Sequence, residues 1–251
     1  MKTKLLLMLS ILFFAISCEE ENNAIDETLV TFTIKLSSSN ILLSKSLAQA
    51  SFQIADQSGT LFTITESRVN VRHIQFDLPE ESDTDSSEKV SLDGPLLIDL
   101  ITGEITPPLD SFSLETGTYK RIDIRLDDSE LEDGLVSGSD PLLDNTMIVE
   151  GTFEYDGNSE RQFQLILKFN EDIRFEDPAG IVIDEIETTA MVLNLVVDEW
   201  LENIDITSCL DDGDLDLDSN GNLIINDNNG LDCQDIESTI KTNIKNNYDF
   251  D

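Results

Sequence analysis

Apolar and polar residues alternate along much of the chain, which is the pattern of β-strands that bury one face. Residues 29–36 alternate without interruption and place four apolar side chains on one face, namely Val30, Phe32, Ile34 and Leu36. The same pattern predicts short strands over residues 51–54, 60–65, 90–92, 96–101, 111–114 and 118–126. Within residues 66–78 the apolar phase changes at Arg72 and His73, and a change by one residue predicts a β-bulge.

A β-hairpin is predicted over residues 146–169. Its alternating halves meet at Asp156-Gly157-Asn158, and an Asp-Gly pair in this position is a strong turn signal. The apolar run 188–200 fits either a last buried strand or an amphipathic helix, and we expect a strand through Val197. Many short strands separated by turns predict a mainly β fold, an antiparallel sandwich or barrel over residues 28–200, and we expect the β-sandwich.

Residues 201–251 differ from this region, because they are rich in Asp and Asn and poor in aromatic residues. We expect a small acidic hairpin or loop there, followed by a terminal helix with Asp232 as its N-cap. Cys233 is followed by three isoleucines at helical spacing, Ile236, Ile240 and Ile244. This stripe is expected to pack on the sandwich, since apolar residues at that spacing share one helix face.

One stretch of the acidic segment resembles the calcium loop of EF-hand and dockerin domains. The resemblance is carried by Asp216, Asp218, Asn220, Asn222 and Asp227, with Gly221 at the sharp turn. It implies Ca²⁺ as a cofactor, held by side-chain oxygens and the Asn222 backbone carbonyl. Position twelve is Asp rather than Glu, however, and no clear helix enters the loop. Asn220-Gly221 between alternating apolar residues also fits a metal-free β-hairpin, so both interpretations stay open.

The start of the chain has the pattern of an export signal. Lys2 and Lys4 precede an apolar run over residues 5–16, which is shorter than the roughly 20 residues of a membrane-spanning helix. The run ends in Ala15-Ile16-Ser17-Cys18, which resembles the lipobox of bacterial lipoproteins. The resemblance implies a signal peptide over residues 1–17 and a lipid on Cys18, which would hold the protein to a membrane. The alternative is an ordinary signal peptide with an incidental cysteine.

Residues 18–27 are expected to form an acidic tether. Glu19-Glu20-Glu21-Asn22-Asn23 resembles the acidic signal that directs some Bacteroidota lipoproteins to the outer face of the outer membrane. We therefore expect an outer-membrane, lipid-anchored protein that is exposed at the surface, with the periplasmic face as the alternative.

The charge of the chain restricts its partners. The sequence has 52 acidic and 15 basic residues, which gives a net charge of −37. Such a surface repels nucleic acid and anionic lipid headgroups, so we exclude both as partners. It attracts divalent cations and basic partners instead.

The two cysteines that remain after Cys18 are Cys209 and Cys233. Two remaining cysteines in an exported protein predict one disulfide bond. Two buried thiols are the alternative. The bridge is favoured because both residues lie in polar, glycine-rich surroundings with little apolar sequence to hold them.

Three segments resemble a prealbumin-like β-sandwich domain of unknown function found in bacterial lipoproteins. They are the "V-x-V-x-x-I" segment 68–76, the "D-L" strand 97–100 and the "G-x-Y-x-x-I-x-I-x-L" strand 114–126. The resemblance covers about residues 28–170. It implies a sandwich fold and no catalytic residues, and we interpret Tyr119 as structural.

Catalysis is not expected from the residue types. The single histidine, His73, falls inside a predicted strand, where a structural role is the usual one. A glycosidase requires two carboxylates at a set separation, but any pair can be proposed among 52 acids. Trp200, the only tryptophan, is expected to be buried rather than to form a glycan platform. We therefore expect a non-catalytic binding or structural module with a protein or glycan ligand; the alternatives are a calcium-dependent glycan-binding accessory protein and a carboxylate glycosidase.

Overall fold

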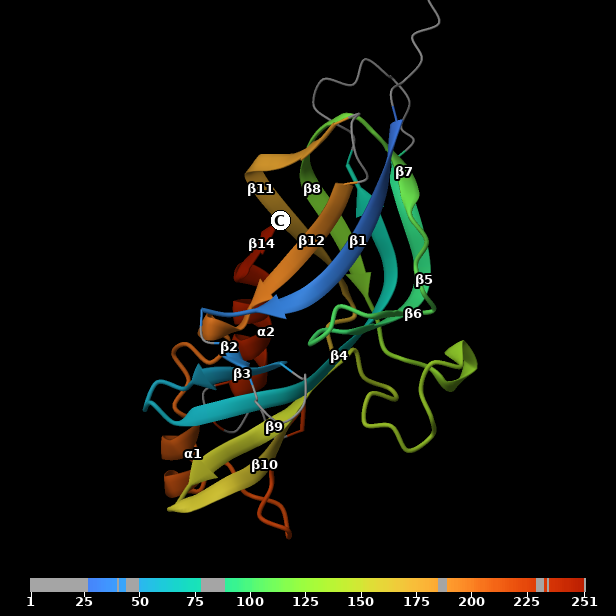
Figure 1. Ribbon diagram of the computed structural model, residues 1–251. Helices are drawn as coiled ribbons and strands as arrows, with labels where there is room; N and C mark the ends of the chain where they lie inside the picture. Colours follow the sequence, from blue (N-terminus) through green and yellow to red (C-terminus); the bar gives the residue numbers. More distant parts are fainter. Residues whose placement is uncertain are drawn as a thin grey trace, which may run out of the picture.

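The computed structural model describes residues 27–39, 41–43, 50–77, 89–184, 189–228, 233 and 235–250. The expected signal peptide, Cys18 and Asp232 lie outside these residues. The fold is mainly β and consists of two sheets, as predicted from the alternation (Figure 1). Within the described part, no helix has the length and apolar character needed to cross a membrane.

The smaller sheet has the strand order β14-β12-β1-β7. Its strands are β1 (Glu27–Ser37), β7 (Phe112–Glu115), β12 (Thr189–Val196) and β14 (Tyr248–Phe250). β12 runs parallel to β1, while β7 and β14 are antiparallel to their neighbours. The predicted strand through residues 188–197 is therefore confirmed, and it ends in the 3₁₀ helix η2 (Val197–Glu199).

The larger sheet has the order β11-β8-β4-β9-β10-β13, and further strands branch from β4. The strands are β2 (Ile41–Leu43), β3 (Ala50–Ala55), β4 (Leu61–Phe76), β5 (Val90–Asp99), β6 (Ile105–Thr106), β8 (Gly117–Leu126), β9 (Met147–Tyr155), β10 (Asn158–Leu167), β11 (Glu171–Ile183) and β13 (Leu223–Ile225). Most pairs are antiparallel, but β13 is parallel to β10, so both sheets are mixed.

β4 is long enough to pair with four strands. Its first half lies between β3 and β9, and its second half lies between β5 and β8. The register shifts between Val71 and His73, which confirms the predicted bulge. Asn70 is buried where β8 and β9 diverge, and its side-chain amide donates to the carbonyls of Asp127 and Asp128 at the end of β8.

One hydrophobic core lies between the sheets. Phe32 of β1 meets Phe76 of β4 edge to face, with ring centroids 5.5 Å apart, so aromatic contact joins the two sheets directly. Trp200 is fully buried in the same core, as expected.

The C-terminal segment contributes to this core. It contains the helices α1 (Ile206–Asp212) and α2 (Ile236–Asn246), and the predicted isoleucine stripe of α2 is buried. The start of α2 differs from the prediction, because Asp235 occupies the N-cap position. Asp235 has a left-handed backbone conformation and makes no capping bond through its side chain.

The acidic segment between β8 and β9 is folded against the sheet by two arginines of β4. Arg68 binds Asp140 through two hydrogen bonds, and Arg72 binds Asp133 in the 3₁₀ helix η1 (Leu131–Asp133). Val136, Leu142 and Ile148 form a small second apolar cluster beneath it. This loop is therefore an ordered part of the fold.

Candidate functional site

A polar pocket lies on the outer face of β4, β8 and β11. The alternation of these strands explains its position, because their apolar residues face the core and the residues between them face outward. Ile74, Ile124 and Ile173 form one inward row across the three strands and are buried. The outward residues on both sides of this row line a pocket of about 460 Å³.

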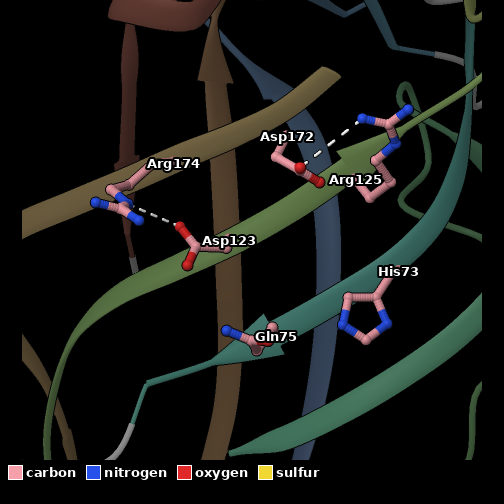
Figure 2. Close-up of a pocket in the computed structure, with 6 residues that line it drawn as sticks. All are labelled: His73, Gln75, Asp123, Arg125, Asp172 and Arg174. Carbon is pink, nitrogen blue, oxygen red and sulfur yellow. Dashed lines mark hydrogen bonds and ion pairs between the residues drawn. The ribbon is translucent and has the colours of Figure 1, made fainter. Parts of the chain in front are cut away.

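The six lining residues form two cross-strand rows (Figure 2). The first row is His73, Arg125 and Asp172, and the second is Gln75, Asp123 and Arg174. Each row takes one residue from each strand, so the register alone brings together side chains that are far apart in the sequence. Each arginine is adjacent to an aspartate, and the pocket offers both donors and acceptors.

The pocket belongs to an unusual concentration of arginines. Five of the six arginines of this strongly acidic chain lie on β4, β8 and β11, namely Arg68, Arg72, Arg121, Arg125 and Arg174. Four of them are held by short ion pairs. The N···O distances are 2.8 Å from Arg68 to Asp140, 2.7 Å from Arg72 to Asp133, 2.6 Å from Arg121 to Asp77 and 2.9 Å from Arg174 to Asp123. The hydrogen bond to Asp123 also raises the pKa of Arg174.

Arg125 differs from the other four arginines. Its guanidinium lies 3.8 Å from Asp172 and 3.9 Å from Asp127, distances that are too long for hydrogen bonds. About a third of its side chain (35%) is exposed. Among the described residues, neither the guanidinium of Arg125 nor the side-chain amide of Gln75 makes a hydrogen bond. The pocket therefore holds a charged, planar donor group that is available to a ligand.

His73 lines this pocket, which the sequence reasoning did not anticipate. Its Nδ1 lies 2.8 Å from Oδ1 of Asp93 on β5, and this contact orients the ring. The predicted bulge was the available signal, because a bulge turns two successive residues to the same face of a sheet. Arg72 and His73 both remain partly exposed between the buried Val71 and Ile74.

The residues of the predicted calcium loop form a tight turn before β13. Leu217 and Leu223 pair across it, and the Gly221 N–H donates to the Asp218 carbonyl at 2.9 Å. The Asp218 carboxylate accepts hydrogen bonds from the backbone and side-chain amides of Asn220 and Asn222, which lower its pKa.

The expected ligand carbonyl, that of Asn222, accepts the Asp218 N–H at 2.8 Å. Asp216 and Asp227 are exposed on either side of the turn. In the described part of the chain, no three His, Cys, Asp or Glu side chains are placed to hold a metal together. Calcium binding stays a prediction.

The predicted disulfide bond joins Cys209 of α1 to Cys233, with the Cα atoms 5.9 Å apart. Both cysteines are buried, and the bridge belongs to the main hydrophobic core. Tyr119 is also buried, and its hydroxyl donates to the Glu115 carbonyl at 3.0 Å. Burial raises the pKa of this hydroxyl, in agreement with a structural role.

No protein-family model, curated protein or solved structure matches this chain. The resemblances to lipoproteins and to calcium loops therefore remain predictions from its own residues.

Proposed function

We propose that this chain is a non-catalytic protein of the cell envelope, anchored through a lipid on Cys18, and that its β-sandwich is a binding module. The observation that carries the binding role is the loosely paired guanidinium of Arg125, which has only long ion pairs in the pocket on β4, β8 and β11. In a purely structural face we would expect each arginine to be closely paired, as the other four are.

The arrangement of the fold supports anchoring at the N-terminal side. β1 begins at Glu27, which follows Cys18 by nine positions, so the expected tether is short. The start of β1 lies beside β7 at one end of the molecule, whereas α1 and the β9–β10 hairpin lie at the other end (Figure 1). A lipid on Cys18 would hold the first end near the membrane and leave the flank with the pocket open to the medium.

The disulfide bond supports export. A bridge between Cys209 and Cys233 is typical of proteins that fold in an oxidising compartment and is rare in the cytosol. It agrees with the export signal that residues 1–17 predict. We propose the outer membrane as the location, with the sandwich displayed on the cell surface.

Anchoring and display are tested on the full-length chain and on Cys18→Ser. We expect the wild-type protein in the membrane fraction with an acylated N-terminal cysteine by mass spectrometry. Protease added to intact cells should digest it. Cys18→Ser should lose the lipid and the membrane attachment. An unmodified Cys18 in the wild-type protein would refute the anchor, and protection from protease in intact cells would place the protein on the periplasmic face.

A further inference from the structure

Resting on the proposed binding function, we infer that the pocket on β4, β8 and β11 binds a carboxylated sugar, a uronate unit of an acidic glycan. Arg125 would bind the carboxylate, and Gln75 and Asp172 would bind ring hydroxyls. The inference depends on the hydrogen-bonding groups that the cross-strand rows leave unused.

The donor side of the pocket fits a carboxylate. A guanidinium presents parallel N–H groups that match the two oxygens of a carboxylate, and such bidentate pairs are among the stronger hydrogen bonds in proteins. Arg125 is the central residue of its row, between His73 and Asp172. Its two neighbouring carboxylates lie beyond hydrogen-bond distance, so an incoming carboxylate need not break a short ion pair.

The acceptor side fits hydroxyl groups. Asp172 is loosely held, with 74% of its side chain exposed, and Gln75 lies in the neighbouring row with both a donor and an acceptor. Asp123 is already bound by Arg174, which leaves its carboxylate less available. A ligand with one carboxylate and several hydroxyls uses both kinds of group, whereas a simple anion uses only the donors.

The residue types of the pocket favour a charged sugar over a neutral one. The six lining residues include no Phe, Tyr or Trp, whose rings are the usual platforms on which a neutral sugar stacks. A volume of about 460 Å³ lies within the usual range of small-ligand pockets, about 300–1,000 Å³. Because Asp127 and Asp172 lie on both sides of Arg125, the guanidinium can take one ligand carboxylate, and the other charges of an acidic glycan must face away from these aspartates.

The test uses the full mature chain in detergent and isothermal titration calorimetry. The probes are trimers of galacturonate, mannuronate and guluronate, and the methyl ester of each trimer is its matched neutral control. Triaspartate is the control for a carboxylate without a sugar. The variants are Arg125→Gln, Arg125→Lys and Lys35→Gln; Lys35→Gln removes one positive charge on β1, which is in the other sheet. Circular dichroism and thermal melting verify that each variant is folded.

We expect at least one uronate trimer to bind, its methyl ester to bind much more weakly, and triaspartate to bind weakly. Arg125→Gln should weaken binding about 10- to 100-fold, the range for loss of a hydrogen bond to a charged group. Arg125→Lys should recover only part of the affinity, and Lys35→Gln should match the wild type.

Four results would overturn the inference. Equal binding of the esters, or unchanged binding in Arg125→Gln, would refute recognition of the carboxylate by Arg125 while a binding module remained. Equal binding of triaspartate would refute the sugar class. If no probe, charged or neutral, bound the folded wild-type chain, the uronate inference would fail, whereas the anchor is tested separately on Cys18.

Discussion

The buried carboxylate of Asp56 accepts a hydrogen bond from the backbone N–H of Ile206, 150 positions further along the chain. Its Oδ2 lies 3.1 Å from Ile206 N, at the start of α1, and its Oδ1 accepts the N–H groups of Ser58 and Thr60 in the β3–β4 turn. One side chain therefore closes a β-turn and caps a helix. This contact holds the C-terminal segment to the sandwich.

Removal of this carboxylate should destabilise the protein. We expect Asp56→Ala to lower the free energy of unfolding by about 2–4 kcal/mol, because N–H groups inside the fold lose a charged acceptor. Urea unfolding with the disulfide intact measures the change. Asp177→Ala is the matched control, since Asp177 accepts the Ala179 N–H on an exposed bulge of β11, and its loss should cost less than about 0.5 kcal/mol. Similar losses for the two variants would contradict the role of Asp56.

Gly151 lies where β9 approaches β4 most closely. A Cβ atom at this position would be 1.9 Å from the Thr63 carbonyl oxygen and 2.8 Å from the Phe163 ring. Gly151→Ala should therefore reduce the unfolding free energy by about 3 kcal/mol, because the strands must move apart. In the loop between β8 and β9, a Cβ at Gly138 would have no atom within 4 Å, so Gly138→Ala should change stability by about 0.5 kcal/mol or less. Thermal melting of the pair distinguishes overpacking from a general effect of replacing glycine.

The Arg68–Asp140 pair should make the loop between β8 and β9 sensitive to acid. Hydrogen bonds from Arg68 hold the pKa of Asp140 below its usual value. A folded-state pKa below the unfolded one adds stability that is fully present above the unfolded value of about 3.9 and is lost as the pH falls through the folded value. Asp140→Asn should therefore cost about 1–3 kcal/mol at pH 7 and progressively less toward pH 3. Urea unfolding across this range measures the difference, and a gap independent of pH would exclude the ion pair as its cause.

The disulfide bond between Cys209 and Cys233 joins residues that are 24 positions apart. In the chain-entropy model, a loop of this length contributes about 3 kcal/mol. We expect the double variant Cys209→Ser/Cys233→Ser to lose about that much and to become insensitive to reductant. The wild-type protein should reach the same lower stability when it is reduced. If reductant lowered the melting temperature of the double variant as well, the effect would have another origin.

The sequence predicted correctly those elements whose signal lies within a few neighbouring residues, such as a turn pair or an alternating strand. Asp156 and Gly157 both have positive φ, 54° and 66°, as the Asp-Gly signal between β9 and β10 requires. β11 was not predicted, because the bulge between Glu176 and Ile181 interrupts its alternation. α1 was also missed, since it has only seven residues and its N-cap, Asp205, stands before a mostly polar stretch.

The pocket could not be predicted from local patterns for a different reason. His73, Asp123 and Asp172 come from strands that are distant in the sequence, and only the pairing of Ile74 and Ile173 with Ile124 places them side by side. Alternation showed that such residues face outward but not which strand lies beside which. The register of non-local strands was the missing information.

Two interpretations of the turn at residues 217–223, a calcium loop and a metal-free hairpin, can be compared through its hydrogen bonds. In the structure the Asp218 carboxylate is satisfied by amides of Asn220 and Asn222, and the Asn222 carbonyl is bonded to Asp218 N. Calcium would have to replace these hydrogen bonds, and Asp in place of Glu at position twelve offers a shorter ligand for doing so.

We therefore expect calorimetric titration with calcium to give a small heat that reflects general attraction to a net charge of −37, and Asp216→Ala, which has one acid fewer, to lower this heat only slightly. Added salt should abolish this heat, because screening removes long-range attraction but not coordination. Lys35→Gln, which makes the chain more negative without touching the turn, should give a slightly larger heat. A saturable heat that survives salt and is lost in Asp216→Ala would instead establish the calcium site, with Asp216 as one of its ligands.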